Sequence, residues 1–132
     1  MARRILIIDD TETMRLFEKM MLSGLGYEIE TAVDGLDGLE KLASFRADLV
    51  LLDVMMPRLD GIETCRRLKG DPATSHIKVV MVTSREEYER VKEAFAAGCD
   101  DYVTKPVDRA ELVGKVEELL RFVEVRETLS GG

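Results

Sequence analysis

Five short apolar runs alternate with five amphipathic stretches along the chain, and this alternation constrains its fold more than any other feature. The candidate strands are residues 4–8, 28–33, 48–52, 78–83 and 101–104. The runs "RADLVLLD" and "IKVVMVTS" are nearly continuous in Val, Leu, Ile and Met, as strands covered by helices on both faces are. "EIETAV" is less uniformly apolar, which is typical of an edge strand. Strict alternation with short loops predicts an α/β fold with a parallel sheet and right-handed crossovers.

The stretches between the strands carry apolar side chains at the spacing of amphipathic helices. The expected buried stripes are Met14, Phe17, Met21 and Leu25 in the first helix, Leu36, Leu39 and Leu42 in the second, Ile62, Cys65 and Leu68 in the third, Val91, Ala94 and Phe95 in the fourth, and Leu112, Val116 and Leu119 in the fifth. Gly24 and Gly26 follow the first helix and Gly98 follows the fourth, as helix-ending glycines do. Asp108 is expected to N-cap the fifth helix, at about 108–126.

The 132 residues are enough for one sizeable core and too few for two ordinary domains. We place a single domain at residues 1–126 and a C-terminal tail, or the start of a linker, at 127–132. The net charge of −7 argues against direct binding of nucleic acid, because that depends on clustered Lys and Arg. No apolar stretch approaches the roughly 20 residues of a membrane span. The two cysteines lack disulfide-framework numbers and metal-site spacing, so a reduced cytoplasmic protein is expected.

Polar side chains follow four of the five strands at their carboxyl ends. They are Asp9 and Asp10 after the first strand, Asp53 after the third, Thr83 and Ser84 after the fourth, and Lys105 after the fifth. Each has an ordinary explanation alone: Asp10 would cap a helix, and Lys105 would be a solvated loop residue. In open parallel sheets, however, ligands bind beyond the carboxyl ends of the strands, where the strand order reverses. Their coincidence at one edge therefore predicts a binding site.

The residue types at this edge indicate phosphoryl chemistry. Three clustered carboxylates raise one another's pKa unless a cation lies between them. Mg²⁺ fits, with Mn²⁺ as a substitute, because it is held by one or two carboxylates, water and phosphate oxygens. The ammonium of Lys105 and the hydroxyl of Thr83 donate hydrogen bonds, which suits phosphate oxygens. One carboxylate would be the nucleophile, since aspartate forms acyl phosphates in two-step transfer.

With these residues identified, the chain closely resembles the receiver domain of two-component response regulators (CheY-like) over about residues 3–122. The matching motifs are "ILIIDD", "DLVLLDVMMPRLDGIE", "VVMVTS" and "GCDDYVTKP". The resemblance implies a (βα)5 flavodoxin-like doubly wound sandwich whose five-stranded parallel sheet has the order 2-1-3-4-5. It also implies a phosphorylation-dependent signalling switch rather than a turnover enzyme. The donor would be the phosphohistidine of a sensor histidine kinase or of a phosphotransfer protein.

The resemblance assigns the metal and phosphoacceptor roles residue by residue. Asp53 would be the phosphoacceptor. Asp10 and Asp53 would bind Mg²⁺ directly, together with the backbone carbonyl of Met55. Asp9 would act mainly through a metal-bound water.

The resemblance also assigns the residues that would respond to phosphorylation. Lys105 would pair with the phosphoryl oxygens, held by a cis peptide before Pro106. Thr83 would be the switch hydroxyl, and Tyr102 the aromatic residue whose rotamer reports the change. The fourth helix, fifth strand and fifth helix would form the output face for a downstream protein or an effector domain.

Two positions depart from the common pattern of the family. Met55 stands two residues after Asp53, and Arg85 two residues after Thr83, where family members tune the loss of the phosphoryl group. Met55 offers no hydrogen bond to an attacking water, and Arg85 would shield or clamp the phosphate. We therefore expect slow self-dephosphorylation.

Other functions fit the residues less well. A phosphorylation-independent receiver-like scaffold would not need the complete set of acidic, hydroxyl and lysine residues. An aspartyl phosphatase would need a second Asp as general acid where Met55 stands. A flavin-binding protein would place an anionic phosphate against the acidic loop "DDTETM". A phosphorylation-linked homodimer remains a candidate, although Ala96 and Phe122 stand where the common dimer would have charges.

Overall fold

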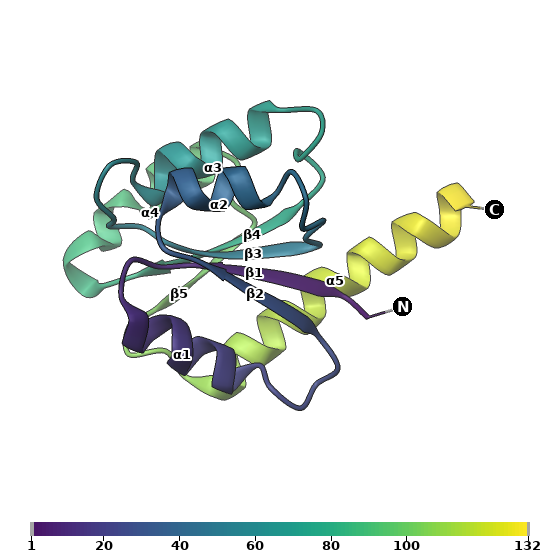
Figure 1. The fold of residues 1–132 in the computed structure, drawn as a ribbon, viewed down its shortest axis with the longest axis horizontal. Helices are drawn as coiled ribbons and strands as arrows, with labels where there is room; N and C mark the ends of the chain where they lie inside the picture. The colour runs from purple at the N-terminus through teal and green to yellow at the C-terminus, as the bar shows by residue number, and fades with distance from the viewer. Residues whose placement is uncertain (1, 132) are drawn as a thin grey trace.

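The fold is one five-stranded parallel sheet between two layers of helices (Figure 1). This computed structural model describes residues 2–131, and it describes their side chains as far as residue 121. The strand order is β2-β1-β3-β4-β5, which confirms the predicted fold. Helices α2, α3 and α4 cover one face of the sheet, and α1 and α5 cover the other. The expected tail, 127–132, and Phe122 lie outside the residues whose side chains are described.

The strands agree with their predicted positions to within one residue at each end. They are β1 (Arg4–Ile8), β2 (Glu28–Ala32), β3 (Leu49–Asp53), β4 (Lys78–Thr83) and β5 (Asp101–Thr104). The helices are α1 (Glu12–Met21), α2 (Gly35–Lys41), α3 (Gly61–Gly70), α4 (Val91–Ala96) and α5 (Arg109–Gly131), with a 3-10 helix η1 (Arg85–Arg90) before α4. β3 is buried along its whole length, whereas β2 at the sheet edge alternates in exposure, as its sequence predicts.

The buried face of α1 differs from its prediction. Phe17, expected in the core, is 47% exposed, whereas Glu18 is 1% exposed. Glu18, Met21 and Leu22 are the buried positions at this end of the helix, so the expected stripe is replaced at Phe17 and kept at Met21. A hydrophobic pattern assigns a glutamate to the solvent face, so it missed Glu18 and placed Phe17 in the core, although Met21 is buried as expected and Met14 and Leu25 are half-buried.

Two further apolar residues predicted for the core are exposed. Leu36 lies outside because α2 packs through Gly35 and Gly38, where an added Cβ would clash with Thr64 and Ile8. Phe95 is 45% exposed and packs edge-on against a neighbouring aromatic ring instead. The third helix has its predicted buried stripe, with Ile62, Cys65 and Leu68 all inside.

The cysteines lie in the layer between α3 and α4. Cys65 Sγ is 3.7 Å from the carbonyl oxygen of Ala97, just after α4. Burial raises the pKa of Cys65 to about 11 and that of Cys99 to about 12. Both thiols are free and buried, so they act as small core residues.

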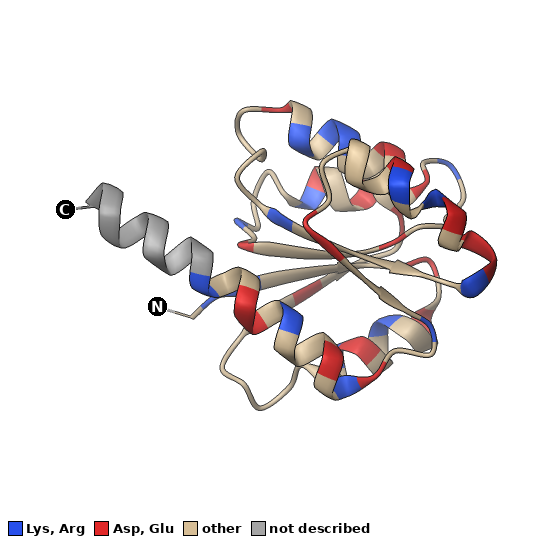
Figure 2. Cartoon of the chain, turned by 180° about the vertical axis from the view of Figure 1, so that it is seen from behind, with Lys and Arg blue, Asp and Glu red and all other residues tan. Residues whose placement is uncertain are grey.

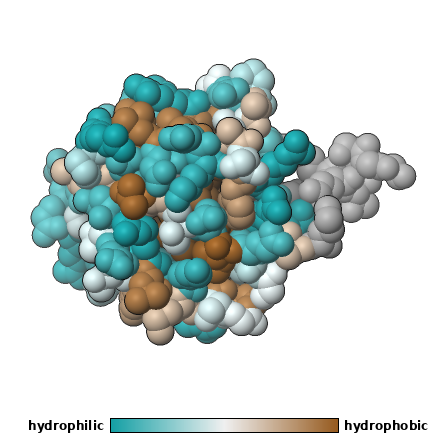
Figure 3. Space-filling model, viewed as in Figure 1, coloured by the Kyte–Doolittle hydropathy of each residue, from teal (hydrophilic) through white to brown (hydrophobic). Residues whose placement is uncertain are grey.

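Charged side chains lie mainly on the helices and loops, and the strands are largely uncharged (Figure 2). The face viewed in Figure 3 is mostly hydrophilic, with separate apolar patches rather than one continuous surface. Within the described part of the chain, no helix combines the length and the apolar character that crossing a membrane requires.

Gly61 allows the start of α3 to approach the end of β3. An alanine Cβ at Gly61 would lie 2.0 Å from the carbonyl oxygen of Asp53. We expect Gly61→Ala to lower the free energy of unfolding by about 1–3 kcal/mol, the usual range for overpacking. Gly114→Ala, on α5, is the control, because a Cβ added there would have no atom of another element within 4 Å. It should raise the free energy of unfolding by roughly 0.5–1 kcal/mol through helix propensity. Urea unfolding measures both, and a Gly61→Ala variant as stable as wild type would contradict the close approach.

Candidate functional site

Three carboxylates meet at the carboxyl edge of the sheet. One oxygen from each of Asp9, Asp10 and Asp53 lies within 4.8 Å of the others, and we call these residues the acidic cluster. Asp9 and Asp53 are 1% and 3% exposed, and Asp10 faces solvent. Asp53 is the last residue of β3 and pairs with Val82 of β4, so the sheet itself fixes its backbone.

Lys105 neutralises part of this cluster. Its Nζ lies 3.0 Å from Asp53 Oδ1, and its backbone N–H donates to the carbonyl of Thr83 at 2.8 Å. Burial and the charge of Asp9 raise the pKa of Asp53 to about 6, although Lys105 acts to lower it. Burial acts to lower the pKa of Lys105, but the hydrogen bond and charge of Asp53 outweigh it and the pKa is raised. The peptide bond between Lys105 and Pro106 is cis.

The carboxylate of Asp9 is held in place by a backbone hydrogen bond to one of its two oxygens. Its Oδ1 accepts the N–H of Thr11 at 2.9 Å, and its carbonyl accepts Arg15 Nη1 at 2.7 Å. Its Oδ2 is buried, and besides the Thr11 N–H the described group placed to donate to this carboxylate is the carboxyl of Glu18 when it is protonated. Burial raises the pKa of Asp9 despite the Thr11 N–H. A set of three carboxylates with no nitrogen or sulfur donor fits a hard divalent cation such as Mg²⁺.

Asp10 does not cap the first helix. The N-cap of α1 is Thr11, whose side chain makes no capping hydrogen bond. Asp10 is exposed and lies with the acidic cluster instead. The ordinary explanation for this residue therefore does not apply.

Thr83 lies at the end of β4, next to β3. It is 1% exposed, and its Oγ1 donates to the carbonyl of Ser84 at 3.2 Å. A hydroxyl bound only to the neighbouring carbonyl can rotate to another acceptor without breaking a tertiary contact. The sheet register thus brings Thr83 to the same edge as Asp53 and Lys105.

Met55 stands two residues after Asp53 and is 54% exposed. Arg85 is exposed at the first residue of η1. The contact to Met55 comes from Arg90 instead, whose Nη1 lies 3.8 Å from Met55 Sδ. Sequence reasoning did not single out Arg90, because a contact across 35 residues leaves no local pattern.

Tyr102 lies in an aromatic group on the face formed by η1, α4, β5 and α5. Its ring centroid is 6.0 Å from that of Tyr88 and 6.1 Å from that of Phe95, both edge-on. Lys115 Nζ is 4.9 Å from the centre of the Tyr102 ring and 3.4 Å from Asp101. The hydroxyls of Tyr88 and Tyr102 are 3.4 Å apart. The charge of Lys115 on this face therefore has partners within the chain.

A fourth carboxyl, Glu18, lies behind the acidic cluster and was missed by the sequence analysis. It is 1% exposed, and its carboxyl is placed to donate a hydrogen bond to the carboxylate of Asp9 when it is protonated. Burial, followed by the charge of Asp9, raises its pKa to about 9. A signal was present: Glu18 stands four residues after Met14 and three before Met21, on an otherwise apolar stripe.

Glu18 should make the stability of the metal-free protein fall with rising pH. Its pKa is higher folded than unfolded, so the folded state binds more protons between about pH 4.5 and pH 9. Stability is thus largest below this window and decreases as pH rises through it. We expect Glu18→Gln to flatten this decrease and to stabilise the protein at pH 8 by at least about 1 kcal/mol, since one pKa unit is about 1.4 kcal/mol.

Urea unfolding in EDTA from pH 5 to pH 9 measures this effect. Glu12→Gln is the control for the loss of one negative charge, because Glu12 is exposed on the same helix. The same pH dependence in wild type and Glu18→Gln would show that the buried carboxyl does not control it.

The comparisons with known proteins agree with this geometry. The profile of the family described as "Response regulator receiver domain" matches residues 5–117. The response regulator PleD of Caulobacter vibrioides is 41% identical over 130 residues, which are 98% of this chain and 28% of that protein. The DNA-binding dual master transcriptional regulator RpaA of Synechocystis is 39% identical over 118 residues, which are 89% of this chain and 49% of that protein.

A solved structure shows the same fold. The chemotaxis protein CheY4 of Vibrio cholerae superposes with a TM-score of 0.84 at 27% identity, covering 90% of this chain and 99% of that one. The chain spans half or less of the length of PleD and RpaA. By its sequence, its strand order and its carboxyl-edge residues, the chain belongs to the receiver domains of two-component response regulators.

Proposed function

We propose that this chain is a phosphorylation-dependent switch that accepts a phosphoryl group on Asp53 from a phosphohistidine. The observation that carries the proposal is the Asp53–Lys105 pair at 3.0 Å, beside two further carboxylates. Asp53 combines burial, a fixed backbone and a cationic partner. Asp10 is exposed, and Asp9 already binds the N–H of Thr11.

In the proposed transfer, an oxygen of Asp53 attacks phosphorus. The new P–O bond forms as the P–N bond to the donor imidazole breaks, and the released ring nitrogen takes up a proton. Lys105 binds the non-bridging phosphoryl oxygens, since its ammonium already lies against the carboxylate. Catalysis of this kind is mainly positioning and charge neutralisation, so the chain modifies itself and does not turn over a substrate.

Mg²⁺ is the proposed cofactor, with Mn²⁺ as a substitute. Asp10, Asp53 and the carbonyl of Met55 would hold the ion directly, and Asp9 would hold it through water. The ion would supply positive charge between the carboxylates and the phosphoryl oxygens. The clustering of three carboxylates, two of them buried, supports this assignment, because like charges close together are costly unless a cation lies between them.

The response begins at Thr83. Its hydroxyl would leave the Ser84 carbonyl for a phosphoryl oxygen, and a charge-assisted hydrogen bond contributes about 1.5–3 kcal/mol. That is enough to shift an equilibrium between conformations a few kcal/mol apart. Tyr102, half-buried beside Tyr88 and Phe95, would change its rotamer and alter the face of α4, β5 and α5.

The proposed partners are a sensor histidine kinase or phosphotransfer protein upstream, and a protein or effector domain downstream. RpaA, which is named as a DNA-binding regulator and of which this chain spans 49%, supports an attached effector. The net charge of −7 favours protein contacts over direct contact with nucleic acid. Free thiols at Cys65 and Cys99 fit a cytoplasmic location. A phosphorylation-linked homodimer would be one form of output.

Intact mass after incubation with acetyl phosphate and Mg²⁺ tests the proposal. Wild type should gain one phosphoryl group, only with the divalent cation, and Asp53→Asn should gain none because the nucleophile is lost. Asp71→Asn, in an exposed turn after α3, is the control and should be modified like wild type. No adduct on wild type, even in a rapid quench, would instead favour a phosphorylation-independent scaffold.

The lifetime of the adduct tests the roles of Met55 and Arg85. Met55→Asn with Arg85→Glu should speed the loss of the phosphoryl group by about tenfold or more, within the range of general acid–base effects. The reason is that an amide and a carboxylate can orient an attacking water, whereas a thioether cannot. The decay of the adduct mass after removal of the donor measures the rate, and an unchanged rate would exclude both residues from this role.

A further inference from the structure

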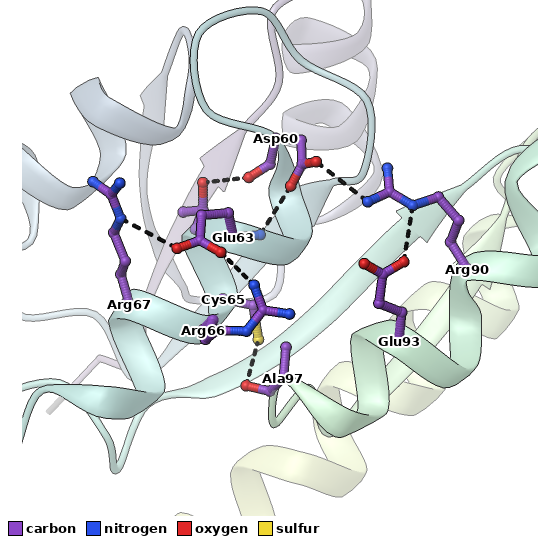
Figure 4. A network of polar contacts seen from close by, with 9 residues as sticks. Asp60, Glu63, Cys65, Arg66, Arg67, Arg90, Glu93 and Ala97 are labelled. Carbon is purple, nitrogen blue, oxygen red and sulfur yellow. Dashed lines mark hydrogen bonds and ion pairs between the residues drawn. The ribbon is translucent and has the colours of Figure 1, made fainter.

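The guanidinium of Arg90 lies between Asp60, just before α3, and Glu93 of α4 (Figure 4). Its Nη2 lies 3.3 Å from Asp60 Oδ2, its Nε lies 3.2 Å from Glu93 Oε2, and its Nη1 lies 3.8 Å from Met55 Sδ. The Arg90 side chain is 33% exposed and that of Asp60 is 35% exposed. One half-buried cation thus contacts three groups from two segments distant in the sequence.

Both ends of this contact lie at element boundaries. Arg90 is the last residue of η1 and precedes the first residue of α4. Asp60 is the N-cap of α3, where its Oδ1 accepts the N–H of Glu63 at 2.9 Å. Asp60 therefore caps α3 with Oδ1 and binds Arg90 with Oδ2.

Arg90 holds the side of the β3–α3 loop that faces α4. The N–H of Gly61 donates to the carbonyl of Val54 at 2.7 Å and closes the base of the loop. Arg58, at a φ of 69°, forms an ion pair with Asp34 on the opposite flank, towards α2. Met55 belongs to the segment that this hydrogen bond closes, between Val54 and Gly61, and stands two residues after the proposed phosphoacceptor.

We propose that Arg90 is a positioning residue for the phosphorylation site. By binding Asp60 and contacting the sulfur of Met55, it fixes the loop that presents the Met55 carbonyl to the cation, and it ties this loop to the start of α4. The inference rests on the proposed function, because it assumes a cation at the acidic cluster. Its consequence is that changes at the start of α4 alter the affinity of the cation site.

The sign of the effect separates positioning from simple charge. Arg90 is a cation near a cation site, so charge alone predicts that its removal strengthens Mg²⁺ binding. The proposed role predicts the opposite, because a loosened loop presents its carbonyl less well. Lys92→Met measures the charge effect, since Lys92 is exposed two residues further along and forms no ion pair among the described residues.

Isothermal titration calorimetry with Mg²⁺ on the full chain tests the inference. We expect Arg90→Met and Asp60→Asn each to raise the Kd by about two- to fivefold, the range for a half-exposed ion pair. Asn retains the capping oxygen of Asp60. The Arg90→Met, Asp60→Asn double variant should bind no more weakly than the weaker single variant, because both changes remove one contact. Charge alone would return the double variant to the wild-type Kd.

Amide hydrogen exchange supplies a readout that does not depend on the cation. Gly61 N–H should exchange faster in Arg90→Met than in wild type or Lys92→Met, while urea unfolding verifies that each variant folds. Wild-type Mg²⁺ affinity in Arg90→Met, or tighter binding, would overturn the inference and leave the proposed function intact. Failure of wild type itself to bind Mg²⁺ would instead contradict the proposed function.

Discussion

Like charges brought together at the end of a parallel sheet are the constraint on which the rest of this structure depends. Burial and mutual repulsion oppose the ionisation of Asp9 and Asp53, and the nearby ammonium of Lys105 offsets only part of that cost. The arrangement persists because the strands are held in register by the core on both faces. The folded chain therefore holds these groups in an arrangement whose repulsion a bound cation would relieve, and this relief would add to the free energy of cation binding.

The sheet fixes only part of the site, so the geometry of the rest depends on the surrounding loops even where they are exposed to solvent. The sheet fixes Asp53 and Thr83, but the loop after β3 lies outside the hydrogen-bonded ladder. Its geometry depends on side chains from both neighbouring segments, Arg58 on one flank and Arg90 on the other. A site built half on a rigid sheet and half on ion-paired loops can keep its nucleophile fixed while its surroundings change.

The sequence predicted most of the fold because its strongest signals are local. Continuous apolar runs marked the strands, and the residues following them marked the carboxyl edge. The prediction for α1 was wrong at Phe17 because Glu18 faces the core instead, where tertiary contacts override the preference of its carboxyl for water. The resemblance to receiver domains correctly implied the strand order. The 3-10 turn before α4 and the position of Arg90 depend on contacts between distant segments, which no periodicity records.

The thiols between α3 and α4 have a consequence for observing the protein at work. Cys65 lies against the carbonyl of Ala97 and has a pKa of about 11, so it is nearly inert to alkylating reagents while the two helices stay packed. Any displacement of α4 that admits solvent would expose it. Cys65 is thus a native probe next to α4, the helix of the proposed output face. The rate at which Cys65 is alkylated would report how often α4 separates from α3.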